Sequence, residues 1–513
     1  MFKIILFSWR LTLIMKKIFY IFFLLFALQS NAQNISFNQF SLGHFRDIVP
    51  LENEMKEVIG YALIYEKGLD DSETKMIREF VLLDSNLNKL TNGEFRLDYN
   101  KKLDYYSNEI KFHNSQLYIS YKAYKDLDYL GLVYYTIDLK TKEIKSSKFF
   151  KEFEVVDIFD LANLKKVKPS FFQYAEFNLN TIGDGDEIYS LGKTRYYLSA
   201  TQYDFFEFAL YNSQFKNVLS FGKTEMYDGK IKEFSYGGIK NNELAYYFIE
   251  TTDHKKLENQ SILQEGIRKL NLKTGEEIFN FKYNSSLVNF SLPRLEQSND
   301  KLFIVSQIKK RFSNQWRSVY MSPTLGIRRT ILDNNGNVLF EKSLKLSEIF
   351  PEFIEENDDK DDNGFKYKIE EVYNFDDSSF CILFERYKSP IGPSNRTISD
   401  YFIVNFDDNG QVMNTTMLDK NNQYWDEPFL FSQVDKENKE VLFYYKDSNK
   451  AKQYEFDFVY INKVKDGKVT QDKIDIKSQN HSKQIKKAKY GHFLIIDYDD
   501  NQIPLGMRLE LAN

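Results

Sequence analysis

The chain has 513 residues, of which 42% are hydrophobic and 28% are charged, and its formal net charge is −5 at pH 7. This composition is typical of a folded globular protein and excludes an intrinsically disordered chain. The small negative charge gives no reason to expect a nucleic-acid partner, since such proteins usually carry a basic domain.

Residues 1–32 have the features of an export signal. Lys16 and Lys17 precede an apolar run over 18–28, and Ala32 is the small residue before a predicted cleavage at Gln33. The alternative is an uncleaved membrane anchor, but the run is about half of the ~20 residues that a span needs. We therefore expect an exported protein, periplasmic or extracellular, with no stable membrane span after cleavage. Amino-terminal sequencing of the mature protein should begin at or near Gln33.

An irregular repeat fills residues 55–513. Each unit has an apolar or aromatic strand, a loop of variable length, and a second strand that returns through a tight polar turn as a third strand. The leading strands are at 61–65, 117–121, 195–199, 244–248, 302–306, 380–384, 441–445 and 492–496. The turns are at 83–88, 139–143, 211–215, 272–276, 332–337, 406–410 and 464–468. Many of these turns contain Asn or Gly, which tolerate the positive φ angles of tight hairpins.

Seven full units and a truncated eighth recur at intervals of about 50 to 80 residues, the scale of repeat proteins. The pattern resembles the β-propeller repeat proteins at the level of the fold, without a WD or kelch signature. The resemblance implies an all-β fold, a β-propeller of seven or eight irregular blades; the alternative is two β-sandwich domains. The truncated unit lacks its closing strands. Residues 35–40, within the N-terminal segment 33–54, could supply one and so remove two free sheet edges.

The single cysteine, Cys381, lies in the apolar run 379–384. A lone cysteine excludes an internal disulfide, and its position in an apolar strand predicts a buried, small apolar side chain rather than a reactive thiol.

In a propeller, the short turns would share one face, and the longer loops at 251–266, 308–324 and 387–399 would share the other, here called the long-loop face. The candidate ligand-binding residues are Trp316, Arg317, Tyr424 and Trp425. Flat aromatic side chains on loops suit sugar rings or peptide side chains, so we expect a protein or glycan partner there. The competing interpretation is that these aromatics fill gaps between blades.

One motif has a defined chemistry. The stretch 359–370 fits the spacing D-x-[DN]-x-[DN]-G-x5-E and resembles an EF-hand loop over twelve residues. The calcium ligands would be Asp359, Asp361, Asn363, the carbonyl of Phe365 and Glu370. The exit of the loop reads as a strand rather than a helix, so the resemblance implies a single calcium loop without a paired hand. The alternative is an acidic, solvated loop.

No G-x-S-x-G, P-loop, H-E-x-x-H or C-x-x-C motif is present. We therefore expect an exported, non-enzymatic binding or scaffold module. The alternative is a carbohydrate-active or other hydrolytic propeller with carboxylates in its central channel, which converging carboxylates with perturbed pKa values would favour.

Overall fold

The computed structural model describes most of the chain after the first 33 residues. The described residues are 34–53, 57–99, 103–113, 116–125, 128–138, 140–141, 143–151, 154–157, 174–184, 187–197, 204–211, 217–221, 231–251, 262–283, 287–298, 300–310, 324–355, 360, 363–388, 397–418, 420, 429–449, 456–465, 467–478 and 481–512. The predicted export signal lies outside them. Within these ranges, no helix is long and apolar enough to cross a bilayer.

The described strands form eight antiparallel sheets, numbered here in chain order. Sheet 1 has β2 (His44–Glu52), β3 (Val58–Leu69), β4 (Lys75–Asp84) and β5 (Lys89–Asp98). Sheet 2 has β6 (Asp104–His113), β7 (Gln116–Lys125), β8 (Asp128–Asp138), β9 (Glu143–Lys151) and β10 (Glu154–Asp157). Sheet 3 has β11 (Tyr174–Asp184), β12 (Glu187–Tyr197), β13 (Asp204–Tyr211) and β14 (Asn217–Phe221). Sheet 4 has β15 (Ile231–Lys240), β16 (Glu243–Thr251), β17 (Ile262–Asn271) and β18 (Glu277–Lys282).

The second half of the chain continues the same pattern. Sheet 5 has β19 (Leu287–Gln297), β20 (Lys301–Lys310), β21 (Thr324–Asp333) and β22 (Val338–Lys345), and the short helix α4 (Leu346–Ile349) follows it. Sheet 6 has β23 (Lys366–Asn374), β24 (Phe380–Lys388), β25 (Thr397–Phe406) and β26 (Val412–Leu418). Sheet 7 has β27 (Phe429–Asp435), β28 (Glu440–Asp447), β29 (Phe458–Lys465) and β30 (Lys468–Asp475). Sheet 8 has β31 (Lys477–Ser478), β32 (His481–Lys487), β33 (His492–Tyr498) and β34 (Pro504–Leu511), with β1 (Ile35–Ser36) added at its edge.

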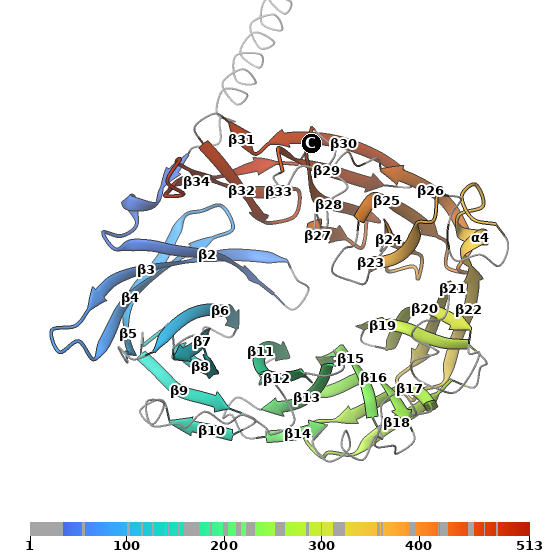
Figure 1. The fold of residues 1–513 in the computed structure, drawn as a ribbon, viewed down its shortest axis with the longest axis horizontal. Coiled ribbons are helices and arrows are strands. Elements are labelled where there is room, and N and C mark those ends of the chain that lie inside the picture. Colours follow the sequence, from blue (N-terminus) through green and yellow to red (C-terminus); the bar gives the residue numbers. More distant parts are fainter. Residues whose placement is uncertain are drawn as a thin grey trace, which may run out of the picture.

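The sheets follow one another around a ring, with the first strand of sheets 1 to 7 toward the centre (Figure 1). The expectation of an all-β, propeller-like fold is confirmed, and eight separate sheets differ from the face-to-face pairs of two sandwich domains. The sequence predicted a repeat unit of three strands. This prediction was wrong, because each sheet has four or five strands. Each sheet also has an inner first strand, such as β27, whose burial is only partial and whose apolar pattern is correspondingly weak.

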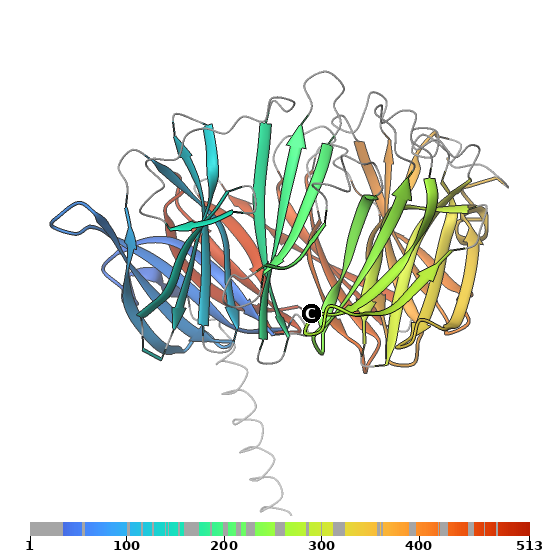
Figure 2. The same cartoon turned by 90° about the horizontal axis from the view of Figure 1, so that it is seen from below.

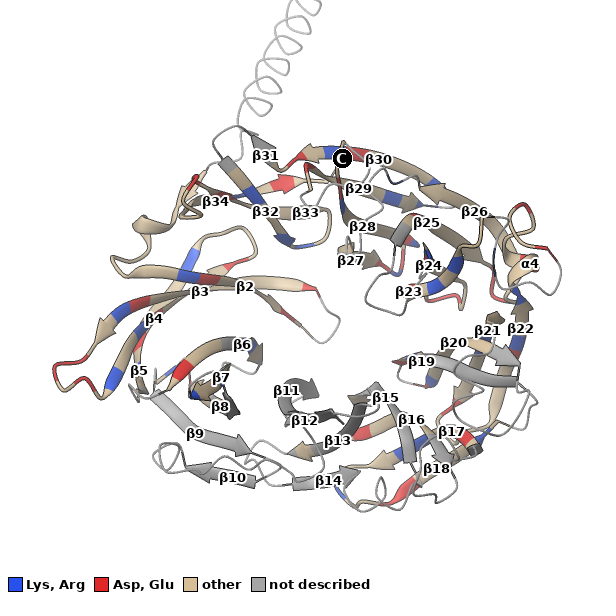
Figure 3. Ribbon diagram, in the orientation of Figure 1, with Lys and Arg blue, Asp and Glu red and all other residues tan. Residues whose placement is uncertain are grey.

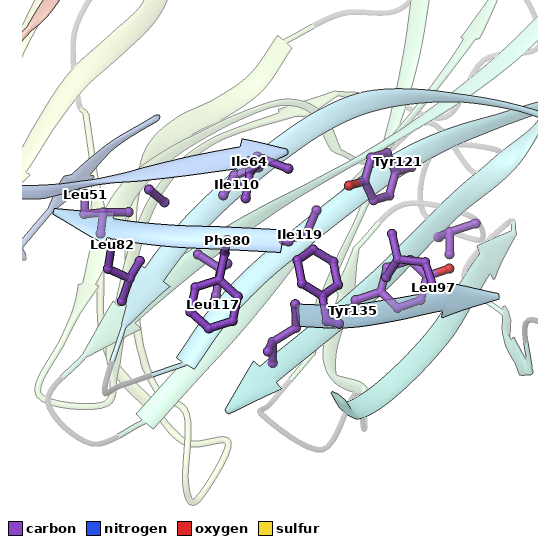
Figure 4. Packing of buried hydrophobic residues seen from close by; sticks show 14 of the residues in the cluster. Leu51, Ile64, Phe80, Leu82, Leu97, Ile110, Leu117, Ile119, Tyr121 and Tyr135 are labelled. Atoms are coloured by element: carbon purple, nitrogen blue, oxygen red, sulfur yellow. The ribbon is translucent and has the colours of Figure 1, made fainter. Parts of the chain in front are cut away.

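The core lies between neighbouring sheets rather than within one central cluster. Leu51, Ile64 and Phe80 of sheet 1 pack with Leu117 and Ile119 of sheet 2 (Figure 4). Comparable clusters join sheets 4 and 5, 5 and 6, 6 and 7, and 7 and 8. Because the second strand of a sheet is covered on both faces, it reads as a continuous apolar run, which is why the sequence revealed it.

The first and last sheets are joined by the N-terminal segment. Ile35 of β1 pairs with Met507 of β34, and the next aromatic residue, Phe37, is 1% exposed within a cluster that contains residues of sheets 8 and 1. The Tyr65 hydroxyl donates to the Phe37 carbonyl oxygen at 2.9 Å. The segment expected to supply a closing strand thus lies at the outer edge of sheet 8 and continues into sheet 1.

Cys381 is 1% exposed in β24, as expected from its apolar run. Complete burial raises the pKa of its thiol well above the ordinary value. The prediction that the Cys381 side chain is buried is confirmed.

The turns 84–88 and 333–337, which join third and fourth strands, share one hydrogen-bonding scheme. In the turn 84–88, one Asp84 carboxylate oxygen accepts the backbone N–H groups of Asn86 and Asn88 at 2.8 Å, and the other accepts the Asn88 amide. Asp333 makes the same three contacts in the turn 333–337. The Asx-type bonds therefore fix the reversal of the chain.

Replacing Asp84 should weaken its turn. Burial alone would raise the pKa of Asp84, but the three hydrogen bonds outweigh it and lower the pKa. The contribution of Asp84 to stability is therefore present at neutral pH and lost as pH falls through the folded-state pKa. We expect Asp84→Ala to reduce the unfolding free energy by about 1 kcal/mol at pH 7, measured by urea denaturation. Asp84→Asn keeps an acceptor and should lose less; equal losses in both variants would contradict this account.

Strand order determines which connections share a face. In a four-stranded antiparallel sheet, the first and third hairpin turns are at one end and the middle connection is at the other. The strand ends Lys388 and Thr397 in sheet 6, and Asp447 and Phe458 in sheet 7, therefore lie at the end of each sheet opposite the short turns, which lie along the lower edge of the ring in Figure 2. The face opposite the short turns is the one that the sequence analysis called the long-loop face.

Candidate functional site

The candidate ligand-binding residues cannot be placed from the structure. Trp316, Arg317, Tyr424 and Trp425 all lie outside the described residues. What the structure does place is the root of the segment that contains Tyr424 and Trp425, because Lys420 is described.

The predicted calcium loop is described only in part. Asp359 and Asp361 lie outside the described residues, whereas Asn363 and Phe365 precede β23 and Glu370 lies within it. The Glu370 carboxylate is 3.1 Å from the ammonium of Lys368. Calcium binding thus stays a prediction, and a calcium ion would have to displace this lysine to use Glu370.

Cations also lie beside the other two described candidate ligands. The Lys388 ammonium donates to the Asn363 carbonyl oxygen at 2.9 Å. The Arg386 guanidinium lies 4.5 Å from the centre of the Phe365 ring. These contacts join the end of the predicted calcium loop to the long-loop end of β24.

A buried charged cluster lies where several loops of the long-loop face begin. Its members share one property: each is at or near the end of a strand that enters this face. They are Glu385 and Arg386 near the end of β24, Asp400 near the start of β25, Lys420 just after β26 and Asp447 at the end of β28. We call these five residues the loop-root cluster. It lies where sheets 6 and 7 adjoin.

The loop-root cluster is held by direct polar contacts. Asp400, which is 7% exposed, accepts a hydrogen bond from the Arg386 guanidinium at 2.7 Å and another from the Ser399 hydroxyl. The Lys420 backbone N–H is 3.5 Å from the second Asp400 oxygen. At the end of β28, the Ser448 backbone N–H donates to the Asp447 carboxylate at 2.8 Å. The Asp400 and Asp447 carboxylates therefore also contact backbone N–H groups at the strand ends from which these loops begin.

Lys420 is a buried cation of the cluster. Burial lowers its pKa to about 8, although the negative charges of Asp447, Glu385 and Asp400 oppose that shift. Its exposed fraction is 5%. A lysine in this setting holds its proton at neutral pH and loses it under mildly alkaline conditions.

Lys420 should give the protein a measurable pH dependence of stability. Its folded-state pKa lies below the ~10.4 of an unfolded chain, so between these values the unfolded state binds more protons and stability rises with pH. Relative to Lys420→Met, the unfolding free energy of the wild type should increase by up to about 3 kcal/mol from pH 7.5 to pH 10.5. Denaturation curves of both proteins across this range provide the measurement. A difference that is constant with pH would show that Lys420 titrates normally.

Three carboxylates on inner strands, those of Asp47, Glu52 and Glu296, have lysine partners. Asp47 and Glu52 of β2 lie 3.1 and 2.9 Å from the ammonium groups of Lys486 and Lys487. Glu296 of β19 is bound by Lys436 and by the Asn374 amide, as part of a link across sheets 5, 6 and 7. These pairings link neighbouring sheets.

Charges of both signs are distributed around the described parts of the ring (Figure 3). Within the part of the chain that the structure describes, no group of three or more His, Cys, Asp or Glu side chains is arranged to hold a metal ion. The described part of the site is therefore the loop-root cluster.

The sequence did not single out the loop-root cluster. Glu385 directly follows the apolar run 380–384, and Asp447 follows 441–445 within two residues, but charged residues end many strands. The three carboxylates and Lys420 meet only because sheets 6 and 7 pack side by side, which no local pattern shows.

Comparison with known families and proteins gives one partial match. The model of a family of unknown function, DUF6770, matches residues 395–513. Asp400, Lys420 and Asp447 lie inside this stretch. No curated protein matches the chain.

Several solved structures have a remote likeness to the chain. The polysaccharide lyase Uly1 has 7% identity and a TM-score of 0.42, with 79% of this chain and 90% of that chain covered. A europium-containing methanol dehydrogenase has 10% identity and a TM-score of 0.38, with 93% and 92% covered. An α-L-arabinanase of Penicillium chrysogenum, in complex with arabinobiose, has 9% identity and a TM-score of 0.32, with 66% and 92% covered. At these scores the likenesses say nothing about the function of this chain.

Proposed function

We propose that the protein is an exported, eight-bladed β-propeller that binds a protein or a glycan at its long-loop face. The observation that carries the proposal is the loop-root cluster. Its hydrogen bonds hold the described strand ends after which the segments 389–396, 421–428 and 450–455 begin. A rigid scaffold that presents loops from one face is the common design of a binding site.

Two features favour binding over hydrolysis. Three carboxylates of the loop-root cluster are buried beside cations, and inner-strand carboxylates such as Asp47 and Glu296 are bound by lysines. Trp316 and Trp425, in contrast, lie in the sequence between the described strands β20 and β21 and between β26 and β27, and a large aromatic side chain in such a connection suits contact with a ligand.

Tryptophan fluorescence tests the proposal, because few tryptophans contribute to the emission of the mature chain. The chain has 3 Trp, and removal of residues 1–32 takes away Trp9. Only the two candidate ligand-binding tryptophans, Trp316 and Trp425, then remain. A panel of soluble oligosaccharides and extended peptides should include ligands that change the emission of the mature protein with saturation.

The single variants assign the signal. Trp316→Phe and Trp425→Phe each leave one reporter, so a ligand at the long-loop face should lose affinity or signal in at least one of them. Saturable binding by calorimetry that leaves both tryptophans and both variants unaffected would contradict the proposal, as would the absence of saturable binding across the panel.

We also propose that calcium binds the loop 359–370, in competition with Lys368 for Glu370. A site of millimolar affinity at ten times its Kd would stabilise the fold by about 1.4 kcal/mol, so 10 mM calcium should raise the Tm. Asp361→Ala with Glu370→Ala should abolish the rise. Magnesium at the same ionic strength is the control, and an equal response of wild type and double variant to calcium would eliminate the site.

A further inference from the structure

We propose that Lys269 and Asn334 react with each other to form an amide cross-link between sheets 4 and 5, with Glu243 as the proton carrier. The cross-link is a covalent modification at the face of the ring that carries the short turns. It is independent of the ligand binding proposed above. The chain has 1 Cys and cannot form an internal disulfide, the covalent link that many exported proteins use.

Three side chains meet at this point. The Lys269 ammonium donates to the Asn334 side-chain oxygen Oδ1 at 3.1 Å and lies 2.5 Å from a Glu243 carboxylate oxygen. Lys269 and Glu243 belong to β17 and β16 of sheet 4, whereas Asn334 lies in the turn 333–337 of sheet 5. Because the Asn334 Cγ carbon is bonded to Oδ1, the Lys269 nitrogen lies close to the carbon that it attacks.

The amine is withdrawn from water, and the turn that carries the amide is held against it. Lys269 is 3% exposed, and its cross-strand neighbours Ala245 and Phe279 belong to the apolar cluster between sheets 4 and 5. The turn packs on this cluster at Gly336, where an added Cβ would lie 2.7 Å from the Phe279 ring. The Asp333 hydrogen bonds fix the same turn. Two reacting groups held in contact avoid the entropy cost of bringing them together.

The reaction is an amide exchange that releases ammonia. The Lys269 ammonium passes a proton to the Glu243 carboxylate, and the neutral amine attacks the Asn334 Cγ to form the Nζ–Cγ bond. Glu243 then gives its proton to Nδ2 and takes one from Nζ. The Cγ–Nδ2 bond breaks, and ammonia leaves with the bonding electron pair. Ammonia takes the remaining proton from Glu243 and departs as ammonium into water, which is accessible because Asn334 is exposed.

Peptide mapping of the exported, mature protein tests the proposal. A tryptic digest should contain the peptide 269–273 joined to the peptide 330–342, with a mass about 17 Da below the sum of the two because one ammonia is lost. The intact mass alone does not decide, since an amino-terminal Gln33 also loses ammonia when it cyclises. Glu243→Gln keeps a polar side chain but cannot carry the proton, and Lys269→Arg has no amine that attacks, so both variants should lack the joined peptide.

A second lysine–asparagine contact is the matched control within the same digest. The Lys489 ammonium donates to the Asn86 Oδ1 at 2.5 Å, but this contact is exposed. Lys489 forms no salt bridge with a carboxylate in the part of the chain that the structure describes. It therefore lacks both the burial and the proton carrier, and Lys489 and Asn86 should be recovered in separate peptides.

Either of two results would overturn the proposal: recovery of Asn334 only in an unjoined peptide with its amide intact, or an equal yield of the joined peptide in Glu243→Gln. The first result would leave Lys269 as a purely ionic link between the sheets. The wild-type map decides by itself if a variant fails to fold. No ligand is used, so failure of this test is distinct from failure of ligand binding at the long-loop face.

Discussion

Phe37→Ala should destabilise the protein by about 3–5 kcal/mol, the range for removing a buried phenylalanine. The Phe37 side chain is 1% exposed, its ring lies 4.0 Å from that of Phe45, and its cluster joins the last sheet to the first. The cavity would form at the seam of the ring. We expect a lower midpoint of urea denaturation and faster exchange of the β34 amides.

Leu42→Ala is the matched control, because Leu42 lies in the same segment with its side chain fully exposed. It should leave stability within about 0.5 kcal/mol of the wild type. A loss of stability that is equal in the two variants, or a Phe37→Ala protein as stable as the wild type, would mean that the segment does not hold the ring together.

Gln433→Glu should be strongly destabilising at pH 7. The Gln433 amide nitrogen donates to the carbonyl oxygens of Ala488, Lys489 and His492 at 2.8, 3.1 and 2.8 Å, and its oxygen accepts the Gly491 N–H at 3.2 Å. The buried Gln433 side chain of sheet 7 thus forms hydrogen bonds with four backbone groups of the turn between β32 and β33 in sheet 8. A carboxylate there would face three carbonyl oxygens, and we expect a loss on the order of 4 kcal/mol.

The sign of the pH dependence separates this mechanism from simple misfolding. The carbonyl oxygens would raise the folded-state pKa of the introduced carboxyl above its unfolded value of about 4.3. Stability of Gln433→Glu relative to Gln433→Ala should therefore be greatest below that value and decline as pH rises through the folded-state pKa. Denaturation of both variants from pH 4 to pH 8 measures this. A relative stability that rises with pH would contradict the assigned hydrogen bonds.

The sequence revealed the parts of the fold that are covered on both faces. Runs such as 380–384 and 441–445 are second strands buried between sheets, and turns such as 333–337 carry the Asp, Asn and Gly that fix them. The all-β class followed from these elements. The inner strands were missed because they are only partly buried and polar, as in β23 with its alternation of lysines and apolar residues.

The functional residues divide in the same way. Local motifs indicated Trp316, Trp425 and the loop 359–370 as candidates, since composition and spacing are visible in a single sequence. The loop-root cluster depends instead on contacts between β24, β25 and β28, which are brought together by the packing of two sheets. Its charged members look like ordinary strand ends until that packing is known.

Hydrogen exchange tests the central claim, that ligands bind at the long-loop face. The measurement compares the mature protein alone with the protein saturated by a ligand identified through the fluorescence titration. The account predicts added protection in the segments 389–396 and 421–428, with the turns at 333–337 and 407–411 unchanged. Protection confined to those turns, or to the inner strands β19, β23 and β27, would contradict it.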